Sequence, residues 1–229
     1  MKFLKKIWTR HRENAPPPIH RDFCKFFAMT EAGGMPLEKW YIGKLHLPVG
    51  FVVACDPLLG LHNAFPFARK VPPGEYPATM LLARSGFRRR NALLLVKFAD
   101  QKPVNFELAA LPGQTGRRAR RHNGFSGFTA DAGIGCICDA HTQKHYNKYL
   151  ERFFKDNPEG NIFDSLFTRT FARKARGEEQ LCYNFYLPTH PQLNVIMFQT
   201  GYGDGIYPAY WGIAEDGSVS SLVIDFIVL

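Results

Sequence analysis

Short runs of apolar, β-branched and aromatic residues, separated by Gly, Pro, Asn and Asp, dominate the chain from residue 40 onward. Brief apolar runs between turn residues are typical of β-strands rather than helices. The strands predicted in this way are Lys44–Leu47, Phe51–Ala54, Tyr76–Ala83, Leu93–Phe98, Phe106–Ala109, Ile134–Cys138, Cys182–Leu187, Val195–Gln199, Ala209–Ile213 and Ser221–Val228. The chain is therefore expected to be rich in β-sheet.

Two glycine-containing turns lie near the end of the chain. Asp216 and Gly217 form the Asp-Gly pair that tight hairpins favour, so the strands on either side are predicted to be antiparallel neighbours. Further upstream, Gly203 and Gly205 flank Asp204, and glycine adopts positive φ values without a steric penalty. We expect a rigid loop in which Gly205 has a positive φ and Asp204 accepts hydrogen bonds from backbone amides.

A helical periodicity interrupts the strands in the second half of the chain. Apolar residues recur there at three- and four-residue spacing in two groups. The groups are Tyr146, Tyr149, Leu150, Phe153 and Phe154, and then Ile162, Phe163, Leu166, Phe167 and Phe171. Because an Asn-Pro-Glu-Gly turn separates them, a two-helix insertion is predicted.

Residues 1–18 are predicted to form a basic amphipathic helix followed by a proline-rich linker. Phe3, Leu4 and Ile7 fall on one side of that helix, and lysines occupy the other. Consecutive prolines at residues 16–18 then favour an extended backbone. A helix of this kind contacts a membrane surface or a partner, or packs on its own core. Peripheral membrane contact by residues 1–12 therefore stays open.

Together these patterns predict an α+β fold: a mostly antiparallel β-sheet, sandwich or barrel-like, with a two-helix insertion and a short N-terminal helix. Residues 19–229 are expected to form a single domain, because a chain of 229 residues that is 45% hydrophobic can bury one sizeable core. No apolar run reaches the roughly 18 to 20 residues of a membrane-spanning helix. The start of the chain also lacks the apolar segment of a secretory signal, so a cytoplasmic protein is expected.

The net charge of +9 is unevenly distributed along the chain. Most of the excess lies in four clusters: Lys2–Arg12, Arg84–Arg90, Arg117–Arg121 and Arg169–Arg176. Such clusters bind an acidic protein, nucleic acid or an anionic membrane, or are simply solvated. An acidic protein partner ranks above nucleic acid, because no nucleic-acid-binding module accompanies the charge. The candidate binding residues of the third cluster are Arg117, Arg118, Arg120 and Arg121.

Aspartates within small or apolar segments are the best lead to a site. A buried carboxylate costs free energy unless it is hydrogen-bonded or paired. The aspartates in such segments are Asp56, Asp131, Asp139, Asp204 and Asp225. In a structural interpretation these aspartates cap turns. In a functional interpretation the first four meet Tyr207 in one pocket, with His141 as a further candidate. The structural interpretation is favoured, because the chain has no Asp-x-Asp-x-Asp-Gly calcium loop.

Motifs with a known catalytic mechanism are missing from the sequence. There is no Gly-x-Ser-x-Gly elbow, Walker loop or dinucleotide fingerprint. Cys136 and Cys138 lack a second ligand pair at zinc-finger spacing. His141 and His145 stand four residues apart, but without the glutamate of a metalloprotease helix. No cofactor and no metal are predicted, and the five cysteines are expected to be reduced.

Several of these segments, taken in order, resemble a bacterial family known as domain of unknown function 4241. The resemblance runs from about residue 42 to the C-terminus and rests on residues 47–58 (LPVGFVVACDPL), 71–77 (VPPGEYP), 131–135 (DAGIG), 138–139 (CD), 200–212 (TGYGDGIYPAYWG) and 223–226 (VIDF). It implies neither an activity nor catalytic residues. The basic run at 117–121 and the first forty residues lie outside the shared pattern.

Three functions are consistent with the sequence. The first is a non-enzymatic protein-binding module, such as an immunity or accessory protein that neutralises a bacterial toxin effector, since patches of charge steer an oppositely charged partner. The second is a hydrolase or metal-assisted enzyme that uses the aspartate pocket. The third is a nucleic-acid-binding protein that uses the arginine clusters. The first is favoured, because no reactive motif accompanies the predicted sheet scaffold.

Overall fold

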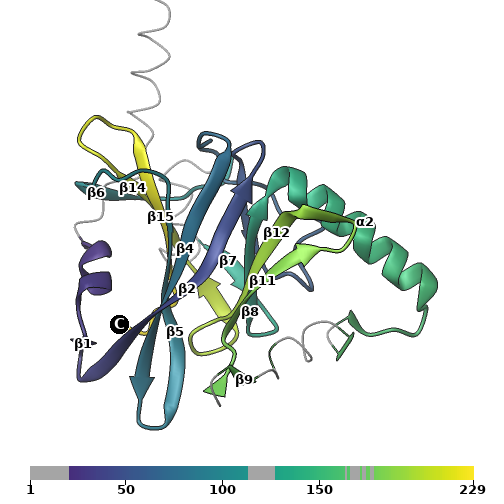
Figure 1. Cartoon of the computed structure of the whole chain (residues 1–229), viewed down its shortest axis with the longest axis horizontal. Helices are drawn as coiled ribbons and strands as arrows, with labels where there is room; N and C mark the ends of the chain where they lie inside the picture. Colours follow the sequence, from purple (N-terminus) through teal and green to yellow (C-terminus); the bar gives the residue numbers. More distant parts are fainter. Residues whose placement is uncertain (1–20, 113–126, 163, 166–170, 172–173, 176–177) are drawn as a thin grey trace, which may run out of the picture.

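The computed structural model describes residues 21–112, 127–162, 164–165, 171, 174–175 and 178–229, and its strands pair antiparallel (Figure 1). The larger sheet has seven strands, in the order β1 (Glu31–Ala32), β2 (Met35–Leu47), β4 (Gly74–Ser85), β5 (Arg88–Lys97), β15 (Val219–Asp225), β14 (Ala209–Ile213) and β6 (Asn105–Leu108). The smaller has four, in the order β11 (Cys182–Leu187), β12 (His190–Gln199), β8 (Ile134–Asp139) and β3 (Val52–Cys55). Two ribbons join β13 (Gly205–Tyr207) to β7 (Phe128–Ala130), and β10 (Glu178–Glu179) to β9 (Lys174–Ala175).

Every segment that the apolar pattern predicted as a strand contains a strand. The predicted hairpin is confirmed as well: β14 and β15 are antiparallel neighbours, and Gly217 has a φ of 82° in the turn between them. The Ala214 amide donates to the Ser218 carbonyl over 2.9 Å and closes that turn. The strand β2 begins at Met35, well before the predicted start at Lys44.

The main core lies between the two large sheets. Leu47 of β2, Met80 of β4 and Leu222 of β15 belong to the same buried cluster as Ile137 of β8 and Ile196 of β12. The larger sheet curls into a half-barrel around this core (Figure 1). Burial of apolar side chains from both sheets supplies the main driving force for this sandwich.

The single α-helix among the described residues, α2 (Ala140–Asp156), covers the outer face of the smaller sheet (Figure 1). Tyr146 of the helix packs in a second buried cluster with Val53 of β3 and Val195 of β12. The predicted fold class is therefore wrong in its helices. A two-helix insertion was expected, and the structure has one helix in the described part of the chain.

The apolar periodicity continues after α2 in a segment that the structure describes only in part. Asn157 ends the helix, and its amide donates to the Phe153 carbonyl over 2.9 Å. Beyond it, Ile162 and Phe171 are buried in the same cluster as Tyr146. Their spacing reflects burial against the smaller sheet. Most of the second predicted helix, and all of the predicted N-terminal helix and linker at residues 1–18, lie outside the described residues.

A short 3₁₀ helix, η1 (Cys24–Ala28), lies against the outer face of the larger sheet (Figure 1). Phe23, directly before it, is buried and stacks on Tyr210 with ring centroids 4.8 Å apart. Both belong to a third apolar cluster with Val223 of β15. None of the helices in the described part of the chain is long and apolar enough to cross a membrane.

Asp225 connects this outer layer to the end of the chain. Its side chain accepts hydrogen bonds from the Ile227 amide, over 2.8 Å, and from the Arg21 guanidinium, over 3.4 Å. Burial nevertheless raises the pKa of Asp225 above the ordinary value of a carboxyl group, against the opposing effects of Ile227 and Arg21. The folded protein therefore keeps this proton to a higher pH than the unfolded chain does.

We expect Asp225→Asn to become more stable, relative to the natural protein, as pH rises. Because the folded-state pKa is raised, the stability that Asp225 contributes is complete below the unfolded pKa and is lost as pH rises through the folded pKa. Asparagine keeps an acceptor oxygen for the Ile227 amide. Because it does not ionise, its contribution to stability does not fall as pH rises. Urea unfolding between about pH 3 and pH 7 tests this: a constant stability difference between the two proteins would contradict it.

Candidate functional site

Asp56 ties together two turns at one end of the smaller sheet. Its carboxylate is 3% exposed and accepts four backbone amides. Leu58 and Leu59 donate to Oδ1 over 2.8 and 3.3 Å, and Asp131 and Ala132 donate to Oδ2 over 3.0 and 3.1 Å. Both carboxylate oxygens are therefore engaged by the backbone, which anchors the turn after β3 to the turn before β8.

Asp139 plays the same part at the other end of β8. It is fully buried and is the N-cap of α2, where Oδ1 accepts the His141 amide over 2.7 Å. Its Oδ2 accepts the amides of Val49 and Gly50 over 3.2 and 2.9 Å. An aspartate at this position satisfies orphan amides of the first helical turn and stabilises the helix dipole.

The predicted aspartates thus divide between the two ends of β8. Asp56 meets the backbone of Asp131 before the strand, and Asp139 ends it. The side chains of Asp131 and Asp204 are exposed. In the described part of the chain, no group of three or more His, Cys, Asp or Glu residues is arranged to hold a metal ion. Arg117, Arg118, Arg120 and Arg121 lie outside the described residues.

The glycine-rich loop is fixed by hydroxyl groups. Tyr207 is buried, and its hydroxyl donates to the Gly203 carbonyl over 2.7 Å. The Thr200 hydroxyl donates to the same oxygen over 2.6 Å. The positive φ in this loop is at Gly203, with a value of 104°, and the expectation of a positive φ at Gly205 is wrong. The carbonyl of Gly203 is therefore the anchor point of the turn.

The two histidines of α2 lie beside a third from the smaller sheet. The ring centroid of His145 is 4.6 Å from that of His141 and 4.1 Å from that of His190. Partial desolvation, followed by the neighbouring His190, His141 and Lys148, lowers the pKa of His145. The three rings lie against one another, and the arrangement does not form a metal site.

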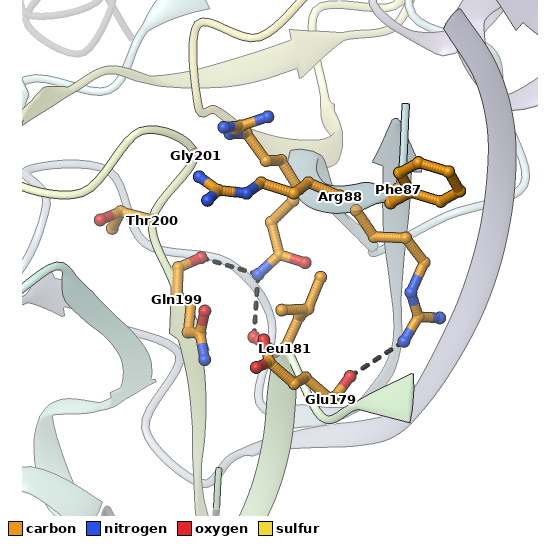
Figure 2. Close-up of a pocket in the computed structure, with 10 residues that line it drawn as sticks. Phe87, Arg88, Glu179, Leu181, Gln199, Thr200 and Gly201 are labelled. Carbon is orange, nitrogen blue, oxygen red and sulfur yellow. Dashed lines mark hydrogen bonds between the residues drawn. The ribbon is translucent and has the colours of Figure 1, made fainter. Parts of the chain in front are cut away.

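A hollow lies beside the β4–β5 hairpin, which extends past the rest of the larger sheet (Figure 1). It has a volume of about 520 Å³, within the range of ligand pockets. Three segments line it: residues 87–91, residues 179 and 181, and residues 199–201. Figure 2 shows Thr200 and Gln199 on one side, Phe87 on the opposite side, and Glu179 and Leu181 below.

The tip of this hairpin is a tight turn with an exposed aromatic residue. Ser85 pairs with Arg88, so Gly86 and Phe87 form a two-residue loop. Gly86 has a φ of 60°, as the first central residue of a type II′ turn requires. The Phe87 side chain is 104% exposed, which is unusual for a large apolar group. The turn therefore presents an aromatic side chain at the rim of the pocket.

Two arginines present guanidinium groups to the pocket. Arg88 is exposed, and Arg90 is half-buried. The Arg90 guanidinium lies 4.7 Å from the centroid of the Tyr202 ring, in the glycine-rich loop. Stacking of this kind holds the guanidinium plane in place and leaves its in-plane N–H groups directed at other acceptors. The glycine-rich loop is thus one wall of an arginine-lined pocket.

Arg89, between these two arginines in sequence, is part of the wall of the pocket. The side chain of Arg89 is only 8% exposed and lies 5.8 Å from the centroid of the Trp40 ring. It donates to the Glu179 carbonyl over 2.9 Å and is 3.9 Å from the Glu38 carboxylate. With three arginines and Glu179 as the charged residues of its lining, the pocket is electropositive.

The basic run of the β4–β5 hairpin is the part of this site that is visible in the sequence. The run Arg84–Arg90 appears among the basic clusters, but nothing in the sequence distinguishes it from the other three. The aromatic residue Phe87 does not single it out either, because Lys2–Arg12 and Arg169–Arg176 also contain aromatic residues. The remaining lining comes from β10–β12 and the glycine-rich loop, which only the fold brings to the hairpin.

In the part of the chain that the structure describes, fold and site together define an antiparallel β-sandwich with a covering helix and an arginine-lined pocket. The family described as "Protein of unknown function (DUF4241)" matches residues 45–224, and the chain belongs to this family. The expected resemblance is thereby confirmed. No curated protein and no solved structure matches the chain.

Proposed function

We propose that this protein is a non-enzymatic binding module that recognises an acidic protein partner at the arginine-lined pocket. Its role would be that of an immunity or accessory protein that neutralises a bacterial toxin effector. The observation that carries this proposal is the placement of Arg88 and Arg90 around a pocket with an exposed Phe87 at its rim. Arginine and aromatic side chains dominate the binding energy of protein interfaces.

The net charge of +9 supports an acidic partner. A positive surface accelerates association with an oppositely charged protein and disfavours like-charged ones. The aspartates give the enzymatic alternative less support, because Asp56 and Asp139 are buried and their oxygens are engaged by backbone amides. A carboxylate held in this way is a structural anion.

Nucleic acid is the second candidate, because Arg90 and Tyr202 combine a cation with a stacking surface. Such binding is strongly weakened by salt. Protein remains the favoured partner, since three separate segments line the pocket and the acidic Glu179 is one of its residues. Non-specific nucleic-acid sites instead form grooves that follow a phosphate backbone.

We expect the protein to co-purify with the product of an adjacent gene, and Arg88→Glu/Arg90→Glu to abolish that interaction. Reversing charges that pair with a partner weakens binding by about a hundredfold or more. Arg89 is left unchanged, because it packs on Trp40 and supports the hairpin. Affinity is measured by titration of the purified proteins, and unfolding of the variant is followed to show that the fold is kept.

The matched control is Lys102→Glu/Lys155→Glu, which makes the same change in net charge at two exposed positions away from the pocket. It should bind the partner within a few-fold of the natural protein. Equal losses in the two double variants would show that only net charge matters. An absence of binding to every neighbouring gene product would contradict the proposed function itself.

A further inference from the structure

One buried polar atom in the pocket lacks a partner. The Asn91 side chain is 2% exposed and lines the pocket. Its Nδ2 donates to the carbonyl oxygens of Leu181 and Gln199 over 2.9 and 2.7 Å. Two carbonyl acceptors require the NH₂ group on that side, which fixes the orientation of the carboxamide. The Oδ1 atom is then left as a buried acceptor without a hydrogen bond.

A buried acceptor of this kind is rare, and its hydrogen bond is supplied by water or by a ligand. A ligand that completes the site must therefore carry a hydrogen-bond donor, and a peptide N–H is one. Asn91 lines the same pocket as Arg88 and Arg90, so the acceptor belongs to a site that also holds two guanidinium groups. The pocket thus combines donors for an anion with one acceptor for an N–H group.

This combination selects among anionic ligands. A carboxylate accepts the paired N–H groups of an arginine in a bidentate manner, and so does a phosphate. A phosphodiester or a fully ionised phosphate group has no hydrogen to donate to Asn91. A peptide that bears Asp or Glu side chains provides a carboxylate and a backbone N–H within the same residue.

We propose, on the basis of the protein-binding function above, that the pocket binds an Asp- or Glu-bearing peptide segment of the partner. Arg88 and Arg90 would hold a side-chain carboxylate, and a backbone N–H of the same segment would donate to Asn91 Oδ1. Phe87 at the rim covers an apolar part of that segment. Glu179 disfavours an excess of negative charge at the lower side of the pocket, where Figure 2 shows it.

Calorimetric titration of the full chain with capped peptides tests this proposal. Hexaglutamate should bind at least about tenfold more tightly than hexaglutamine, since the charged pair with arginine is lost in the latter. Arg88→Gln/Arg90→Gln should remove most of that preference. Lys102→Gln/Lys155→Gln, the matched control, should retain it. Hexaglutamate with N-methylated backbone amides should bind about tenfold more weakly, because it cannot donate to Asn91.

Three results would overturn the proposal. They are equal binding of hexaglutamate and hexaglutamine, equal binding of the N-methylated peptide, and displacement of hexaglutamate by equimolar inorganic phosphate or by an oligothymidine twelve-mer. Each of these leaves the protein-binding function intact if the adjacent gene product still co-purifies and Arg88→Glu/Arg90→Glu still abolishes the interaction. If no adjacent gene product co-purified but hexaglutamate still bound as expected, the pocket proposal would stand and the proposed partner would be wrong. The pocket would then serve a different acidic protein.

Discussion

Gly50→Ala is expected to lower the free energy of unfolding by on the order of 3–5 kcal/mol, the range of severe single substitutions. Gly50 has a φ of 76°, where a side chain costs about 1–2 kcal/mol. A Cβ atom would also overlap the carbonyl oxygen of Val71, which is backbone and cannot rotate away. The two residues are already joined by a hydrogen bond of 2.9 Å from the Val71 amide to the Gly50 carbonyl.

Gly217→Ala is the matched control for this prediction. Gly217 has a φ of 82°, and no atom lies within 4 Å of an added Cβ. It should therefore lose only the conformational part, about 1–2 kcal/mol. Urea unfolding of both variants gives the comparison. If Gly50→Ala lost no more stability than Gly217→Ala, the close approach of residues 50 and 71 would not be as described.

The strands could be predicted because each carries its own signal. Ile134–Asp139 is buried along its entire length and reads as a continuous apolar run, while the β14–β15 hairpin is signalled by Asp216-Gly217. The early half of β2 gave no such signal. Residues from Met35 to Trp40 are exposed or half-buried, so the strand is defined by its pairing with β4.

Helices could not be distinguished by periodicity alone. The spacing of apolar residues reports which side chains are buried, and both α2 and the segment after it bury theirs in one cluster against the smaller sheet. Only α2 combines that spacing with a start signal, the cap at Asp139. In the second group, Ile162 and Phe171 are buried in that cluster, and most of the residues between them lie outside the described part of the chain.

The candidate site was only partly predictable. The glycine-rich loop stood out in the sequence, and the structure places Thr200, Gly201 and Tyr202 at the pocket. Its partner, the β4–β5 hairpin, is more than a hundred residues away in sequence. A pocket assembled from distant segments depends on strand pairing and sheet packing, which local patterns do not encode. The unpartnered oxygen of Asn91 is likewise a property of the folded geometry.

Asp56→Ala is expected to lower the free energy of unfolding by about 3 kcal/mol, since a charged acceptor contributes about 1.5–3 kcal/mol per hydrogen bond and partial rehydration of the amides offsets some of the loss. Four amides lose their acceptor, and the turn after β3 is released from the turn before β8. In thermal unfolding this corresponds to a decrease in Tm of about 6–12 °C for a chain of this size.

Two further variants separate the hydrogen bonds from other effects of the change. Asp56→Asn preserves the side-chain volume but places an NH₂ group against two backbone N–H groups, so it should lose nearly as much stability as Asp56→Ala. Asp204→Ala removes an exposed carboxylate and should leave Tm unchanged within about 1 °C. A stable Asp56→Asn protein would show that volume, rather than amide binding, is what Asp56 provides. An unchanged Tm in both Asp56 variants would show that the carboxylate is not needed for stability. That result would favour the enzymatic alternative.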